Sequence, residues 1–372
     1  MQIRRVDVLS VVTEILKAQR MPVGSRLKAA QHRLVAARMQ RSYTSGSHQV
    51  FNASVVTKFT SGSELAVNSP ELWLQMSFEQ SVRAALLYFD MFDFPLTENE
   101  LYFFLPLKMT RSEFDSQIRH SEVRKSGGYY LLRETDQIIQ LRQSREKKAK
   151  RMLAASHLVG KTLRHFPFLR GAFLSGSLSK GVDSGDADID LFIVSAEDRL
   201  WICRSALIGF KKLFLLNSKK YLCPNYFLTE KHLEIPEKNI FTATEIITLR
   251  PLYNNLLLAE FLKANEWISA FFPNYELTDS GEPAGISPVQ RISERILADE
   301  YLERMDKRLM EYFRKVWKQR YPGFDDARRE FLFRTTPHSS KIHPNDFQTR
   351  VLTGYEKRLE ENHLWRLTRL DD

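Results

Sequence analysis

Apolar and polar residues follow a regular helical period only from Phe78 onward. The segment SVRAALLYFDMFDF (81–94) has apolar residues at helical spacing, which predicts a helix. The stretches TENE (97–100) and TRSE (110–113) are capping boxes, and each predicts the start of a further short helix. In RKSGGYYLLR (124–133), two glycines separate a polar arm from an apolar arm, which predicts a β-hairpin.

Three short helices followed by a hairpin resemble a winged helix, which we predict over residues 76–139. Its third helix carries Arg111, Arg119 and His120, but three acidic residues lie among them. The charges nearly cancel, which is unfavourable for docking on phosphates. We therefore regard DNA binding as an alternative, and favour a packing or dimerisation role for this module.

The pattern then changes to two apolar runs joined by a polar loop. Residues 169–175 predict a strand that ends at Gly176 and Ser177, and ten residues later Asp188 and Asp190 open the strand DIDLFIV. Residues two apart in a strand point to the same face, so the two carboxylates lie together. Such a pair repels unless it is protonated or bridged by a cation, and oxygen-only ligation suits Mg²⁺.

The Gly-Ser turn, the ten-residue spacing and the acid pair in an apolar setting resemble the signature of the DNA polymerase β-like nucleotidyltransferase superfamily. The resemblance covers roughly residues 168–235 and is greatest to the small stand-alone nucleotidyltransferase domains of bacteria. In this comparison Asp183 and Asp186 lie in the connecting loop and are interpreted as turn formers.

The resemblance implies a two-metal reaction on a nucleoside triphosphate, with ATP favoured. Asp188 and Asp190 are expected to hold two Mg²⁺ ions and to be catalytic. Gly176 permits close backbone approach, Ser177 offers a hydroxyl and an amide to a phosphate oxygen, and Lys180 is expected to help bind the triphosphate.

The superfamily places a third carboxylate on a later strand, after an intervening helix, here predicted over 199–216. The following segment, 221–235, is predicted to form a pair of strands. Asn225 occupies the apparent position of the acid in the first of them. Glu234, between two apolar residues, fits the pattern better than Glu230 at the turn, so Glu234 is assigned as the third acid. The alternative is that Glu234 is a solvent-facing strand residue.

The remaining sequence is predominantly helical in pattern. A long helix is expected over 140–166, with the basic residues from Arg142 to Arg151 on a solvated face. From residue 241 onward, apolar residues at helical spacing predict a helical C-terminal domain. His338 and His343 are five residues apart across a proline-containing loop, which is not a helical ligand spacing, so no metal role is expected for them.

Residues 1–75 lack a sustained period and contain Ser- and Gly-containing loops, which predicts a poorly ordered basic extension. This segment carries +6 of the formal net charge of +10, so the basicity of the whole chain is weak evidence that the remaining residues bind nucleic acid. Two cysteines exclude a disulfide framework, and every long apolar run is interrupted by charge. These features predict a cytoplasmic protein with no membrane partner.

Taken together, the sequence predicts an α+β protein with a nucleotidyltransferase core over 140–240, a mixed sheet flanked by helices. The core lies between the winged-helix-like domain (76–139) and the helical C-terminal domain (241–372). The expected function is Mg²⁺-dependent transfer of a nucleoside monophosphate, with AMP favoured, to a hydroxyl of a small molecule or protein. Two alternatives stay open: a winged-helix regulator whose core only binds nucleotide, and a toxin–antitoxin component.

Overall fold

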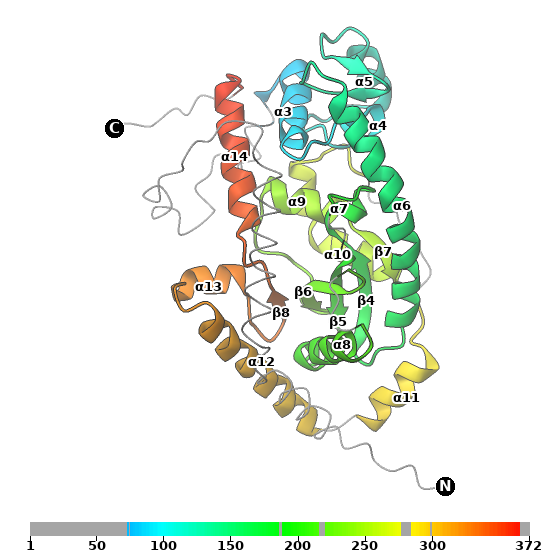
Figure 1. Ribbon diagram of the computed structural model, residues 1–372, viewed down its shortest axis with the longest axis vertical. Helices are drawn as coiled ribbons and strands as arrows, with labels where there is room; N and C mark the ends of the chain where they lie inside the picture. Colours follow the sequence, from blue (N-terminus) through cyan, green and yellow to red (C-terminus); the bar gives the residue numbers. More distant parts are fainter. Residues whose placement is uncertain are drawn as a thin grey trace, which may run out of the picture. The chain divides into compact units, whose positions relative to one another are not determined.

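A computed structural model describes most of the chain from Trp73 onward (Figure 1). The described residues are 73, 75–185, 188–215, 220–276, 284–297 and 300–364. All of them belong to one compact unit that starts at Thr60. The predicted extension 1–75 therefore lies outside the described residues, except for Trp73 and Gln75. Within the described part of the chain, none of the helices combines the length and apolar character that a membrane span requires.

The first described region contains three short helices and a small antiparallel sheet. Its elements are α3 (Phe78–Asp90), β1 (Leu96–Thr97), α4 (Glu98–Phe103), α5 (Arg111–Ile118), β2 (Lys125–Ser126) and β3 (Tyr129–Tyr130). Thr97 and Thr110 cap α4 and α5 through complete capping boxes, as predicted. Gly127 (φ 56°) and Gly128 (φ 85°) form the predicted hairpin turn, because both positions need a left-handed backbone. Strand β1 was not predicted, and it joins the hairpin in the order β1-β3-β2.

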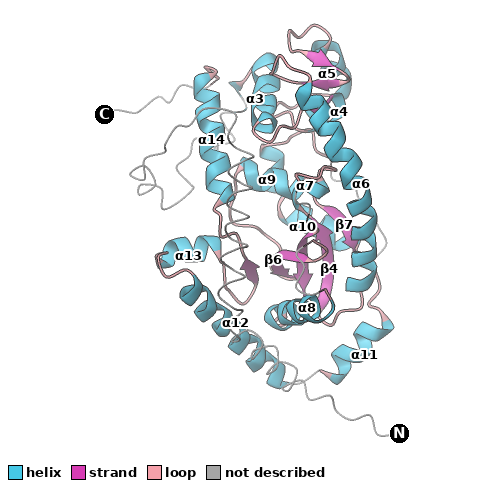
Figure 2. Ribbon diagram, viewed as in Figure 1, coloured by secondary structure: helices cyan, strands magenta, loops and turns pink. Residues whose placement is uncertain are grey.

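A mixed sheet forms the centre of the described residues, with strand order β7-β4-β5-β6-β8 (Figure 2). The strands are β4 (Leu169–Leu174), β5 (Asp190–Ser195), β6 (Cys223–Thr229), β7 (Arg250–Tyr253) and β8 (Ser339–Lys341). Strands β5 and β6 run parallel, and the other neighbours are antiparallel. The predicted α+β class with a mixed, helix-flanked sheet is thereby confirmed.

Helices pack against this sheet and against one another. They are α6 (Gln137–Leu163), α7 (Gly176–Ser179), α8 (Leu200–Phe214), α9 (Ile240–Ile247), α10 (Asn255–Ala264), the 3-10 helix η4 (Glu266–Ala270), α11 (Pro288–Ile296), α12 (Glu300–Arg320), α13 (Asp326–Leu332) and α14 (Phe347–Glu361). On α10, the ring of Phe261 lies 4.9 Å from that of Phe192 on β5. Helix α6 contacts β7 so closely that a Cβ on Gly160 would lie 2.6 Å from the Leu252 carbonyl oxygen. Such aromatic and backbone contacts fix the sheet between its flanking helices.

The central sheet also includes strands from the predicted helical C-terminal domain (241–372). Strands β7 and β8 come from this region, and they form the two edges of the sheet. Helix α14 packs against α3, where the Tyr355 hydroxyl donates to the Ala84 carbonyl oxygen at 3.0 Å (Figure 1). The edge strands escaped prediction because four and three residues are too few to display strand alternation.

The basic stretch of α6 was predicted to lie on a solvated face, but this is wrong for Arg142, which is only 4% exposed. Its guanidinium lies 3.5 Å from the Phe94 ring centroid and forms 2.7 Å ion pairs with Glu100 and Glu146. These partners neutralise the buried charge, so Arg142 ties α6 to α4. Phe94 and Glu100 are remote from Arg142 in sequence, which is why helical periodicity alone could not reveal this burial.

Candidate active site

The turn after β4 is held directly against the start of β5. The Ser175 amide donates to the Asp190 carbonyl oxygen at 2.9 Å, which continues the β4–β5 ladder into the turn. Gly176 follows with φ 70°, and a Cβ at this position would lie 2.6 Å from Asp190 Oδ2. Only glycine accommodates both the left-handed backbone and this close approach. The predicted Gly-Ser turn and Asp190 are therefore brought together.

Asp190 is the first residue of β5, and its side chain lies beside polar groups of neighbouring elements. Its Oδ1 accepts a hydrogen bond from Asn225 Nδ2 at 2.7 Å. Burial, followed by the negative charge of Asp188, raises the pKa of Asp190 to about 6, although the hydrogen bond from Asn225 acts to lower it. Asp188 therefore lies close enough for mutual repulsion. A hard divalent cation would relieve that repulsion, so these two carboxylates fit the Mg²⁺ that the sequence predicts.

Asn225 occupies the position beside the acid pair on the neighbouring strand. It lies on β6 at a register irregularity between β5 and β6, where its backbone oxygen accepts from the Ile342 amide at 3.1 Å. The sequence argument had placed an amide where an acid was expected, and the structure puts this amide on Asp190. The described chain therefore supplies a neutral hydrogen-bond donor at this position.

Glu234, the predicted third acid, is not brought to the pair. The segment 221–235 forms the single strand β6 rather than two strands, and Glu234 follows its far end. Its side chain is 60% exposed and pairs with Lys238 at 2.7 Å. The prediction failed because the Ile235 amide is taken by the Asn265 side chain at 2.8 Å instead of by a strand partner. The assignment of Glu234 as third ligand is thus corrected.

Lys180 and Ser177 lie next to the turn, but each already has a protein partner. Lys180 Nζ donates to Glu245 Oε1 at 2.7 Å and to the Gly176 carbonyl oxygen at 3.3 Å. Ser177 Oγ lies 3.3 Å from Ser184 Oγ. A phosphate at this turn would therefore compete with Glu245 for the Lys180 ammonium group.

Glu245 is the site residue that the sequence analysis missed. It lies on α9, whose N-terminus is capped by Asn239, which accepts from the Thr242 amide at 2.9 Å. The Glu245 carboxylate reaches Lys180, and its charge contributes to the raised pKa of Asp190. A single acid 55 positions after the motif carried no signal of this approach.

The site thus combines two mutually repelling carboxylates, a glycine turn against one of them, and an ammonium group held by a third acid. Oxygen ligands of this kind suit a hard cation, and the open turn suits an anionic group beside it. In comparisons of the chain with known proteins, no family model, no curated protein and no solved structure matches it.

Proposed function

We propose that the protein is a Mg²⁺-dependent nucleotidyltransferase. It would move a nucleoside monophosphate, with AMP favoured, from a nucleoside triphosphate to a hydroxyl of a small molecule or protein. The observation that carries the proposal is the contact between Gly176 and Asp190, beside the charge of Asp188. In this proposal, the backbone amides of the turn donate hydrogen bonds to phosphate oxygens, next to a carboxylate pair suited to a divalent cation.

Each residue of the site has a role in this proposal. Asp188 and Asp190 would hold two Mg²⁺ ions, which when bound lower the pKa of an acceptor hydroxyl and neutralise the leaving pyrophosphate. Asn225 orients Asp190 by donating to Oδ1, which leaves Oδ2 on the side of Gly176. The acid pair and the turn are thereby fixed relative to each other before substrate arrives.

Two cations next to the turn would bind the triphosphate. Lys180 is held within reach by Glu245. Arg250, at the start of β7, has Nη2 3.6 Å from the position that a Cβ on Gly181 would take, so its guanidinium lies against the loop. Glu245 is the third acid of the site, after Asp188 and Asp190, and its charge raises the pKa of Asp190. We assign to Glu245 the positioning of Lys180.

A second candidate function is favoured by Asn225. A nucleotide-binding domain without transfer activity, as in a regulator or a toxin–antitoxin component, would not need a carboxylate at this position. An amide there supports Asp190 through its hydrogen bond but adds no negative charge for a metal. The two functions differ in whether the α-phosphorus is attacked, and this difference is measurable.

The winged-helix-like region gives little support to DNA binding. Arg111, on the helix expected to read DNA, pairs with Asp115 at 2.7 Å and with Glu98 at 3.2 Å. These partners would have to be released before Arg111 could bind a phosphate. We therefore propose a packing role for this region, and nucleotide with a small-molecule or protein acceptor as the partners of the core.

The proposal is tested by incubating the full chain with labelled nucleoside triphosphate, Mg²⁺ and cell lysate. We expect a macromolecular or small-molecule product labelled from α-³²P but not from γ-³²P, with ATP the best donor. Asp188→Asn and Asp190→Asn should each abolish this label. The matched control is Asp183→Asn, because Asp183 accepts from the Gly185 amide at 2.7 Å and an asparagine oxygen can replace it.

Calorimetric titration with ATP and Mg²⁺ separates the two candidate functions. Binding lost in Asp190→Asn, without transfer of label, identifies the nucleotide-binding regulator. If the Asp188→Asn and Asp190→Asn variants bind Mg²⁺–ATP as the unsubstituted chain does, the site assignment is wrong and both candidates fail.

A further inference from the structure

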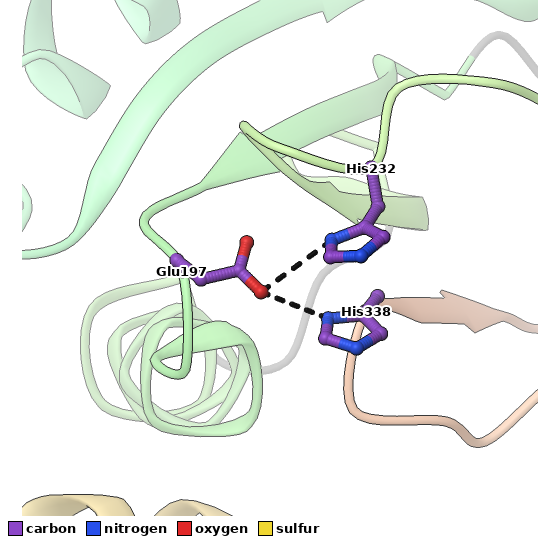
Figure 3. A group of neighbouring side chains, drawn as sticks. All are labelled: Glu197, His232 and His338. Atoms are coloured by element: carbon purple, nitrogen blue, oxygen red, sulfur yellow. Dashed lines mark ion pairs between the residues drawn. The ribbon is translucent and has the colours of Figure 1, made fainter.

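Three strand ends meet at the end of the sheet opposite the acid pair. Glu197 follows the last residue of β5 by two positions, and His232 follows the end of parallel β6. His338 immediately precedes β8, which runs antiparallel to β6. The His338 carbonyl oxygen accepts from the Thr229 amide at 3.0 Å. The sheet register therefore brings one acid and two imidazoles together from three separate parts of the chain (Figure 3).

The ligand atoms of these side chains converge. Glu197 Oε1 lies 3.4 Å from His232 Nδ1 and 3.0 Å from His338 Nδ1. In a tetrahedral zinc site with bonds of about 2.0–2.1 Å, neighbouring ligand atoms are roughly 3.3 Å apart. The two distances from Glu197 are therefore close to that spacing, and the ligand atoms of all three residues lie within 4.8 Å of one another.

Two atoms of this group are left without a hydrogen bond. Among the described residues, Glu197 Oε2 and His338 Nδ1 are both buried and make no hydrogen bond, because the 3.0 Å contact of His338 Nδ1 with Glu197 Oε1 lacks hydrogen-bond geometry. The two imidazole rings stack with centroids 3.6 Å apart and planes 20° apart. The stacked rings and the Glu197 carboxylate thus form one compact group of possible metal ligands. A bound cation would satisfy the buried atoms and keep both rings neutral.

We propose that Glu197, His232 and His338 form a Zn²⁺ site. Two histidines and one glutamate are a ligand set typical of zinc, and three protein ligands leave a fourth position for water. Beside the two imidazoles is a cavity of about 440 Å³ that gives such a water access from solvent. Thr229 Oγ1 lies 3.2 Å from His232 Nδ1, and its hydroxyl turns away when that nitrogen binds the metal.

No local pattern in the sequence indicated this site. The sequence prediction was that His338 and His343 have no metal role, because their spacing does not suit a shared ion. His343 is buried elsewhere, and burial lowers its pKa to about 4. The true partners of His338 are 106 and 141 positions earlier in the chain, so no local spacing connects them.

The proposed zinc site is independent of the nucleotidyltransferase proposal. Asp190 begins β5 and Glu197 follows its end, so the two groups are separated by the full length of a six-residue strand, roughly 20 Å. Either site can therefore be removed without touching the other.

The test is titration of tag-free, EDTA-treated full-length protein with Zn²⁺ by calorimetry, and with Co²⁺ followed by its visible absorption. We expect one ion per chain and the intense absorption of tetrahedral Co²⁺. His232→Ala and His338→Ala should abolish both signals, and Glu197→Gln should weaken binding by at least about 10- to 100-fold.

The controls separate this site from other possible ligands. His157→Ala replaces an exposed histidine on α6 and should bind Zn²⁺ as the unsubstituted chain does. Asp188→Asn/Asp190→Asn should also retain the site, which excludes binding at the acid pair. Circular dichroism in EDTA checks that each variant is folded, and Glu197→Gln serves if an alanine variant is not. Absence of stoichiometric binding, or binding retained in His232→Ala, overturns the proposal.

Discussion

Asp190 carries a folding cost that depends on pH. Its pKa is raised from 3.8 to about 6 by burial and by Asp188, so ionisation is harder in the folded chain. Below about pH 4 the group is protonated in both folded and unfolded chains, and the cost is absent. The cost grows as the pH rises through 4 to 6 and then stays constant, at up to about 3 kcal/mol.

Asp190→Asn should therefore stabilise the metal-free protein at neutral pH. The amide cannot ionise, and its oxygen can still accept the bond from Asn225. We expect urea unfolding in EDTA to give a higher free energy of unfolding for the variant at pH 7.5, and no difference near pH 4. If Asp190→Asn instead has the lower free energy of unfolding at pH 7.5, the ionised Asp190 carboxylate is not destabilised by its surroundings.

Asn225→Asp tests whether this position can become a third metal ligand. The change removes the donor to Asp190 and adds a negative charge, so without metal the variant should lose about 1–3 kcal/mol of stability at pH 7.5. Mg²⁺ should restore that stability, and its affinity should exceed that of the unsubstituted chain.

The matched change is Asn225→Ala, which also removes the donor but adds no ligand. It should be destabilised without any gain from Mg²⁺. Thermal shifts of the three proteins over a Mg²⁺ series measure both effects. Equal responses of the aspartate and alanine variants would count against a metal at this position.

At the scale of single elements, α8 is capped by a residue from another helix. Asp306 on α12 accepts from the Ile202 amide in the first turn of α8 at 2.8 Å. Burial raises the pKa of Asp306 to about 7, so the carboxylate form becomes costly as the pH rises through about 4 to 7. The same contact therefore caps a helix and docks two helices together.

Asp306→Ala should lower the free energy of unfolding by about 1–2 kcal/mol, because first-turn amides of α8 lose their acceptor. Asp306→Asn keeps an acceptor and cannot ionise, so it should be the more stable variant, with an advantage over the unsubstituted chain that grows from pH 6 to pH 8. Urea unfolding at both pH values measures this order. An asparagine variant as unstable as the alanine variant would exclude the capping role.

Elements whose signals are local could be predicted, and those set by distant partners could not. The capping boxes at Thr97 and Thr110 marked the starts of α4 and α5 because their hydrogen bonds span three residues. The Gly176 turn and the acid pair were likewise within one short stretch. The cap of α8 comes from α12 through helix packing, and the proposed zinc ligands are brought together by the register of the sheet, so neither has a local sequence signal.

At the scale of the whole molecule, the N-terminal and C-terminal helices of the described chain depend on each other. Tyr355 on α14 stacks on Trp73 with centroids 6.0 Å apart and meets Tyr88 of α3 edge-on at 5.1 Å. Arg358 pairs with Asp90 at 2.6 Å. Periodicity predicted the helix within 81–94 and a helical region from residue 241 onward, but it could not show that the two ends pack together. Residues from 76–139 and 241–372 share one hydrophobic core.

This shared core predicts that the region 76–139 does not fold alone. Tyr355→Ala should lower the free energy of unfolding of the full chain by about 3–5 kcal/mol, because it removes a fully buried ring from between α3 and α14. Tyr355→Phe removes only the hydroxyl that donates to Ala84, and should cost about 1 kcal/mol. Fluorescence and circular dichroism should report a single common transition in both variants. An isolated 76–139 fragment with native helicity and cooperative melting would contradict the shared core and restore the winged-helix-like region as an independent domain.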